Sequence, residues 1–525
     1  MSRRKKILLT IAASLVGLIV VLVIISILVL QSAWFSNYVR EKIIAATEDS
    51  TGGVVEIGSF QFEWTHLTAR IRNFVLHGTE PKSSDPLVRV PLLEVRLKLF
   101  AGLKKAVDID YLGVHGPQVN LIVMPDGTTN VPQPKIPKQP SQTSGLETVV
   151  DLAIHQFQID NGLLMASQTP FSARGENLRA LLNYNLLTPS YQGNLQIDPL
   201  LLASGNRPPI KVHVNVPVTI EKDAVRVADA KLNTDQSQIV LNASIQNMNA
   251  PVIDGKLNAS LSLPEIQRGL DLPIEANAKG APKVLSAELA LRMDEKSNTI
   301  QIQTAHIGLG QTTLQASGTL DQSKNGSAQF NANLALGELS SLLGVSSVQT
   351  GGDLQANGNL KLDAKNNFAA DGTLNSRGVS VRSGTTRLSG ISLYSPFHAD
   401  PYLVSLDGLK LNAFGGTLAA KIFIEKMQQL SVEGNLRNLS LPGIATAFTG
   451  KRLGYDATLS GPIKAQGDLA GADSVVRTPH MPAPLMTPAH ATQLSPMSSR
   501  KRSRTLAIAG KMFGCLTGGR AVSQK

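Results

Sequence analysis

The stretch Lys211-Val-His-Val-Asn-Val-Pro-Val-Thr-Ile-Glu221 places Val or Ile at every second position. Such a period of two puts the apolar side chains on one face of a β-strand and the other side chains on the opposite face. Similar runs, separated by breaks that contain Gly, Asn or Asp, recur from about residue 54 to residue 470. The sequence therefore predicts a mainly β protein, an elongated, repeating β-groove or taco-like sheet with short helices and one continuous apolar face.

The apolar residues of these runs are the candidate lining of that groove. Aromatic residues make up only 4% of the chain, so the face is smooth and aliphatic. It suits flexible hydrocarbon as well as a second sheet, and two interpretations stay open: a track for acyl chains, or an ordinary packed β-core. The clearest stripes are formed by Leu93, Val95, Leu97, Leu99, Val212, Val214, Val216, Val218, Ile220, Leu285, Leu289, Leu291, Leu418, Ile422 and Ile424.

The N-terminal segment from Ile7 through Leu18 to Leu30 is uncharged and dominated by Ile, Leu and Val. As a helix it would span roughly 36 Å, which is enough to cross a bilayer. The basic cluster of residues 3–6 before it favours a cytoplasmic N-terminus. We expect an uncleaved transmembrane helix and not a signal peptide, because Leu30 and Gln31 are not the small residues of a cleavage site.

Beyond the anchor, the spacing of apolar residues from Trp34 to Ala46 predicts that the helix continues until Gly52-Gly53 and covers the start of the sheet. The predicted regions are residues 1–33, the basic stub and anchor; 34–131, the cap helix and the start of the groove; 132–148, a Pro-rich linker or surface loop; 149–472, the repeating groove; and 473–525, a basic tail.

A weak internal repeat runs through the groove region. Leu261-Ser-Leu-Pro-Glu-Ile, Leu334-Ala-Leu-Gly-Glu-Leu and Leu439-Ser-Leu-Pro-Gly-Ile are each expected to end a strand and to enter a turn or short helix. The tail from residue 473 to residue 525 lacks both the alternation and acidic side chains after Asp473. Either it is a disordered basic tail or it is translated out of frame after a frameshift.

The charges and motifs of the chain argue against several classes of function. Of the net charge of +11, four basic residues belong to the N-terminal cluster and eight to the tail, which leaves about −1 for the remainder. A basic groove for nucleic acid is therefore not expected. Single histidines, a lone Cys515, the Asp108/Asp110 pair and Gly308-Leu-Gly310 do not form a metal, catalytic or dinucleotide motif. We expect no enzyme activity and no cofactor.

Several segments, taken in order, resemble the AsmA/TamB family of bacterial envelope proteins over roughly residues 1 to 470. Besides the anchor they are Trp64, Pro91-Leu-Leu-Glu-Val-Arg-Leu-Lys-Leu99, Val114-His-Gly-Pro-Gln-Val-Asn-Leu121, Asp126-Gly-Thr-Thr-Asn130, Phe414-Gly-Gly-Thr-Leu-Ala-Ala-Lys421 and Leu439-Ser-Leu-Pro442. The resemblance implies a single-pass protein of the bacterial inner membrane, with its bulk in the periplasm. The ending of the chain departs from this resemblance, and we expect the family's terminal region to be missing or replaced here.

The same resemblance implies two functions. The first is non-enzymatic binding or conduction of membrane phospholipids along the groove between the inner and outer membranes. The alternative is an envelope assembly factor that pairs strand edges with outer-membrane proteins. A third hypothesis, from the residues alone, is an anchored, adhesin-like β-solenoid with a closed, dry core.

Overall fold

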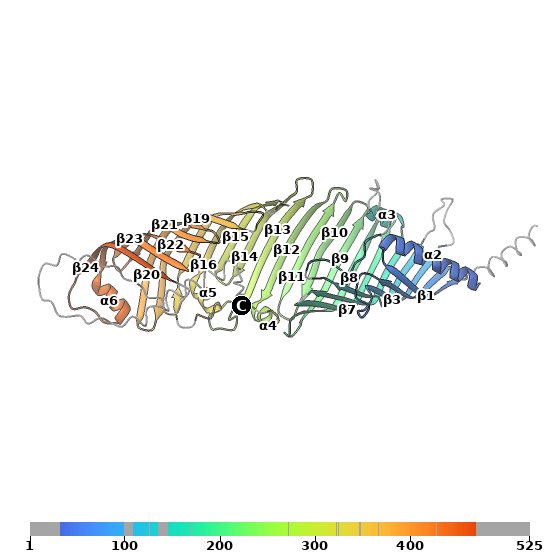
Figure 1. Cartoon of the computed structure of the whole chain (residues 1–525), viewed down its shortest axis with the longest axis horizontal. Helices are drawn as coiled ribbons and strands as arrows, with labels where there is room; N and C mark the ends of the chain where they lie inside the picture. Colours follow the sequence, from blue (N-terminus) through green and yellow to red (C-terminus); the bar gives the residue numbers. More distant parts are fainter. Residues whose placement is uncertain are drawn as a thin grey trace, which may run out of the picture. The chain divides into compact units, whose positions relative to one another are not determined.

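The computed structural model describes residues 32–98, 109–124, 126–134, 145–168, 170–270, 272–321, 323, 325–345, 348–365, 367–426 and 428–468. Within these ranges the chain is mainly β, and its twenty-four strands are assigned to one mixed sheet accompanied by five helices (Figure 1). Among the described helices, none has the length and apolarity needed to cross a bilayer. The predicted anchor with Ile7, Leu18 and Leu30, the groove residue Leu99, and the tail 473–525 lie outside the described residues.

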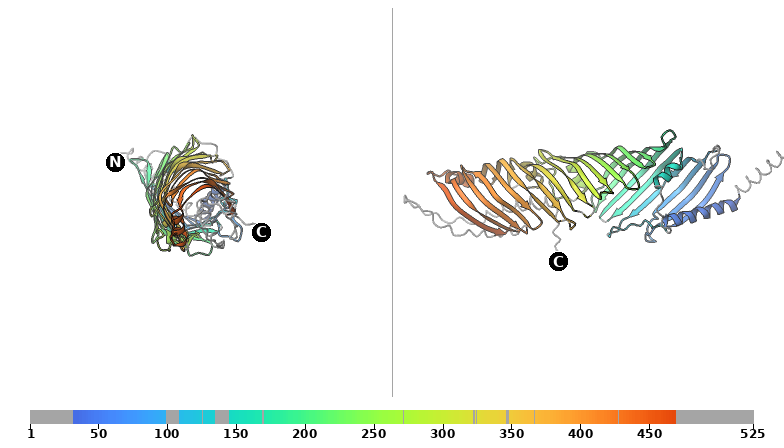
Figure 2. Two further views of the ribbon diagram at one scale, coloured as in Figure 1. Left: turned by 90° about the vertical axis from the view of Figure 1, so that its left-hand side faces the viewer. Right: turned by 90° about the horizontal axis from the view of Figure 1, so that it is seen from above.

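The chain divides into two compact units, each of which is described by itself. The first unit comprises residues 1–254 and 268–270, and the second comprises residues 255–267 and 271–525. Figure 2 shows that the strands within each unit lie side by side.

The first unit opens with a helix and continues as strands. All strand pairs recorded in it are antiparallel except β4–β6 and β5–β6, which are parallel. Its elements are α2 (Ala33–Thr51), β1 (Val54–Glu63), β2 (Thr68–His77), β3 (Val88–Leu97), β4 (Ile109–His115), β5 (Gln118–Ile122), α3 (Gly145–Asp151), β6 (Gln156–Gln168), β7 (Phe171–Asn185), β8 (Ser190–Ser204), β9 (Ile210–Glu221), β10 (Ala224–Asn233) and β11 (Gln238–Gln246).

The second unit is an antiparallel meander with short helices. Strand β12 (Val252–Ser262) crosses the unit boundary, and α4 (Leu263–Gly269) follows it. The remaining elements are β13 (Val284–Asp294), β14 (Thr299–Leu309), β15 (Thr312–Asp321), β16 (Gly326–Ala335), α5 (Leu336–Leu342), β17 (Gln349–Gly351), β18 (Asp353–Leu362), β19 (Phe368–Ser383), β20 (Thr386–Ala399), β21 (Leu403–Ala413), β22 (Gly416–Glu425), β23 (Gln429–Ser440), α6 (Leu441–Thr449) and β24 (Thr458–Asp468).

The predicted internal repeat is present as three strand-to-helix transitions. Strands β12, β16 and β23 each end where α4, α5 and α6 begin. In each case the first N–H of the helix donates to the carbonyl just before the next long strand: Leu263 to Lys283, Leu336 to Gly352 and Leu441 to Ala457, at 2.9, 3.1 and 2.9 Å. The three similar sequences therefore make the same backbone connection at corresponding places.

Most of the predicted linker 132–148 lies outside the described residues, but its last four residues, 145–148, belong to helix α3 and not to a loop. The helix forms because Val150, at its end, is fully buried against the sheet together with Ile154 and Tyr191. Burial of this apolar contact outweighs the polar composition that indicated a loop.

Helix α2 ends at Gly52, as predicted, but it does not begin as a continuation of the anchor. Ser32 has an extended backbone, with φ −71° and ψ 146°, and its Oγ accepts a hydrogen bond from the N–H of Phe35. This is an N-cap, and it marks the start of a separate helix. The apolar spacing is also divided between two faces: Phe35 packs near Phe60 of β1, whereas Trp34 and Tyr38 are exposed.

Candidate functional site

In the first unit, one apolar face can be followed from strand to strand through the pairing register. A single path runs across β1, β2, β3, β4, β6, β7, β8 and β9, and every step is a recorded pair of neighbouring residues. Its members are Phe60, Ile71, Leu93, Val114, Ile159, Ala180, Leu195 and Val216. Side chains of directly paired residues lie on the same face of a sheet. The predicted stripes of β3 and β9 are therefore parts of one surface.

The second unit carries an equivalent face. Starting at Leu289 of β13, the register passes through Ala305, Ala316, Phe330, Gly358, Gly372 and Phe397. Farther along, Leu406 pairs with Ile422, Ile422 with Val432, and Val432 with Ala465. Of the predicted candidates, all that lie in described residues are on the apolar face of their own strand.

Helices cover parts of this face, and α2 packs along β1, where Phe35 lies near Phe60. In the first unit, α3 contributes Val150 to a cluster that includes the apolar-face residues Leu182 and Ile220. In the second, Leu263 of α4 and Leu342 of α5 form a core against which Leu285 and Leu309 pack. Elsewhere, among the described residues, no second sheet lies over the face.

Exposure of the apolar side chains agrees with this partial cover. Leu202 is 40% exposed and Ile307 is 38% exposed, although their strand neighbours on the same face are apolar. Most described residues of the predicted stripes are half-buried, and Val212 is an exception that is buried. The apolar side chains contact their neighbours on adjacent strands, but much of the face is not covered by another part of the described chain.

In the second unit, two glycines and two phenylalanines make the apolar face uneven. Gly358 pairs with Gly372, and the rings of Phe330 and Phe397 lie on either side of this pair with their centroids 6.5 Å apart. A Cβ on Gly358 would lie 2.3 Å from the carbonyl oxygen of Asp371, so only glycine allows this approach of β18 and β19. The alternation in the sequence did not predict this arrangement.

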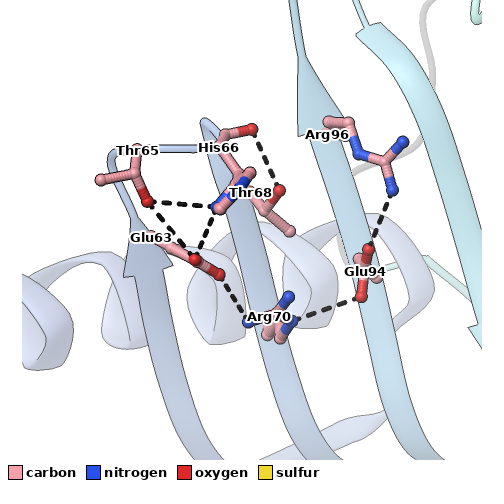
Figure 3. A network of polar contacts seen from close by, with 7 residues as sticks. All are labelled: Glu63, Thr65, His66, Thr68, Arg70, Glu94 and Arg96. Carbon is pink, nitrogen blue, oxygen red and sulfur yellow. Dashed lines mark hydrogen bonds and ion pairs between the residues drawn. The ribbon is translucent and has the colours of Figure 1, made fainter.

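The opposite face is polar and charged, as the network on β1–β3 shows (Figure 3). The Arg70 guanidinium donates to Glu63 at 2.9 Å and to Glu94 on the next strand at 3.3 Å. Hydrogen bonds from His66 and Arg70 lower the pKa of the Glu63 carboxyl. These groups are open to solvent, which identifies this face as the solvated one.

Single histidines on the polar face pair with carboxylates of adjacent strands. His115 is 2.8 Å from Asp160 and His398 is 2.6 Å from Asp371. The hydrogen bond to Asp371 raises the pKa of His398, because it favours the charged imidazole. Among the described residues, no group of three or more His, Cys, Asp or Glu is placed to hold a metal ion.

A hollow of about 560 Å³ lies between β14, β15, β16 and β18. Its lining includes Ile302, Ala328 and Leu360, which belong to the apolar face, and polar neighbours of these residues such as Gln303 and Lys361. The hollow therefore lies on strands that carry the apolar face, and this face is the candidate functional site.

No family model, curated protein or solved structure matches this chain. The sequence located the stripes correctly on strands. It did not locate the aromatic pair, which joins residues 67 positions apart in the chain, or the cover supplied by α3, since neither depends on local alternation.

Proposed function

We propose that this protein is a non-enzymatic, lipid-binding protein of the AsmA/TamB type, whose apolar face receives the acyl chains of membrane phospholipids. The observation that carries the proposal is the register of paired apolar residues from strand to strand within each unit, together with the exposure of some side chains on this face. A sealed β-core would leave no such exposure at Leu202 or Ile307. In the envelope of a bacterium, such a face suits transfer of phospholipid between the inner and outer membranes.

The energetics predict that an acyl chain binds to the face but can still move along it. Each methylene removed from water contributes about 0.8 kcal/mol. Strands lie about 4.8 Å apart, and one leaflet of hydrocarbon is about 15 Å thick, so an acyl chain would cross about three strands. Moving by one strand exchanges similar aliphatic contacts, which keeps the barrier low, while the headgroup stays in water.

Photo-crosslinking tests this proposal. A benzophenone amino acid is introduced at Ile307 of β14, on the apolar face, and separately at Gln315 of β15, whose strand partner is His306 and which belongs to the polar face. The full chain is irradiated in cells, and adducts are identified by mass spectrometry. Phospholipid adducts at position 307 and not at position 315 are expected. Equal yields at both positions, or none at 307, would contradict the proposal.

A second function, strand-edge pairing with outer-membrane proteins, is favoured by one observation. Among the described strands, β24 pairs with β23 alone, and its residues alternate strictly between half-buried and exposed. An unpaired edge is a template for another strand. Crosslinks from the β24 edge to barrel proteins that persist in an Ile307→Lys variant would support this function in place of lipid binding.

A further inference from the structure

Helix α2 presents an aromatic and basic ridge that its packing on the sheet does not use. Trp34 is 68% exposed and Tyr38 is 49% exposed. Their rings are stacked with centroids 5.7 Å apart and an interplanar angle of 12°. One turn farther, the Lys42 ammonium lies 5.7 Å from the centre of the Tyr38 ring. The three residues are spaced by four, so they form one ridge along the helix.

Contacts on either flank of this ridge hold α2 against β1. The ring of Phe35 lies edge-on to Phe60 of β1 at 6.4 Å. At the other end of the helix, the Glu48 carboxylate accepts a hydrogen bond from the N–H of Val55 at 3.0 Å. Two separate contacts therefore fix the rotation of α2, and the ridge is directed away from β1.

The position of this ridge in the chain indicates what the ridge contacts. The uncharged segment 7–30 ends two residues before the N-cap Ser32 and four residues before Trp34. Because Ser32 is extended, the axis of α2 is free to differ from that of any preceding segment. Trp, Tyr and Lys are the residues that concentrate in the headgroup layer, where an apolar ring and a polar tip are both satisfied.

We propose that the ridge of Trp34, Tyr38 and Lys42 lies in the headgroup layer of a phospholipid membrane, with α2 along the surface. The rings enter the boundary between headgroups and hydrocarbon, and the Lys42 ammonium contacts lipid phosphates. Exposed Asp49, two turns beyond Lys42, limits this contact to the N-terminal half of the helix. Phe60 on the apolar face of β1 is then held close to the bilayer, where a lipid would enter.

This inference rests on the membrane anchor expected from residues 7–30 but not on lipid conduction. It is tested by tryptophan fluorescence, because the chain has only two tryptophans. The full chain carrying Trp64→Phe, which leaves Trp34, is reconstituted in vesicles of phosphatidylethanolamine and phosphatidylglycerol. The matched control is Trp34→Phe, which leaves Trp64, 40% exposed in the turn between β1 and β2.

Vesicles contain lipid with a nitroxide either on the headgroup or near the end of the acyl chain. We expect the headgroup nitroxide to quench Trp34 at least two-fold more than the deep one, and to quench Trp64 weakly. Lys42→Glu should reduce the quenching of Trp34. Equal quenching of the two tryptophans, or quenching of Trp34 by aqueous iodide but not by lipid, would overturn the inference. Lipid crosslinks at Ile307 that persist despite this result would leave the proposed function standing.

Discussion

The substitution Ile307→Lys distinguishes between two hypotheses: an apolar face that is open to solvent and a β-core that is closed. Ile307 is 38% exposed, so about 60% of its surface is covered. Full burial of an isoleucine contributes about 1.5–3 kcal/mol, and the substitution should therefore cost about 1–2 kcal/mol of folding free energy. The lysine ammonium reaches water over the open face. In a sealed core, an unpaired ammonium would cost several kcal/mol and the protein would unfold.

The same substitution should weaken lipid binding more than it weakens the fold. If the introduced ammonium keeps roughly three methylenes of an acyl chain away from the face, about 2.4 kcal/mol of binding free energy is lost. This corresponds to a roughly 50-fold weaker affinity for the lipid. Thermal unfolding followed by circular dichroism and binding of a fluorescent phospholipid measure the two effects on the full chain. Gln315→Lys, on the polar face, is the control and should change neither. A folded Ile307→Lys protein with unchanged lipid affinity, or an unfolded one beside an intact control, refutes the reasoning.

Three further substitutions examine the packing and the charges. Gly358→Val should lower the free energy of unfolding, measured with a chemical denaturant, by about 1–3 kcal/mol, because the new side chain meets the neighbouring strand. The control Gly467→Val, with open space around it, should be nearly neutral. Equal losses of stability in the two variants would contradict the close approach of β18 and β19. Tyr191→Phe removes the hydroxyl that accepts a hydrogen bond from the buried backbone N–H of Ile154 at 2.8 Å. It should lower the free energy of unfolding by about 1–3 kcal/mol in the same measurement, and an unchanged stability would contradict a buried hydrogen bond. The Asp371 carboxylate raises the pKa of His398, so its stabilisation is full below the unfolded pKa of 6.5 and is lost as pH rises through the folded value. His398→Gln should therefore lower the melting temperature more at pH 5.5 than at pH 8.5, and a larger loss at pH 8.5 would count against the pair.

Local alternation was sufficient to place the strands. The described strands, from Val54 to Asp468, lie within the predicted span of about residues 54 to 470, and the stripe from Val212 to Ile220 is one apolar side of β9. The helices after Ser262, Ala335 and Ser440 were indicated by their repeated sequences. These features depend on residues close together in the chain, where period and turn chemistry carry the information.

The features that sequence did not predict depend on distant residues. The parallel pairing of β6 with β4 and β5 is decided by the chain that returns through α3, and no alternation pattern records it. Trp34 and Phe35 are adjacent and both aromatic, yet one is exposed and the other packs near Phe60. Helical spacing alone does not tell which face meets the sheet.

The most direct test of the central claim is native mass spectrometry of the full chain, released gently from detergent. An apolar face that receives acyl chains predicts peaks heavier than the bare protein by whole phospholipid molecules, and their loss in Ile307→Lys. A single peak at the mass of the bare chain, obtained for folded protein purified from membranes, would contradict the account.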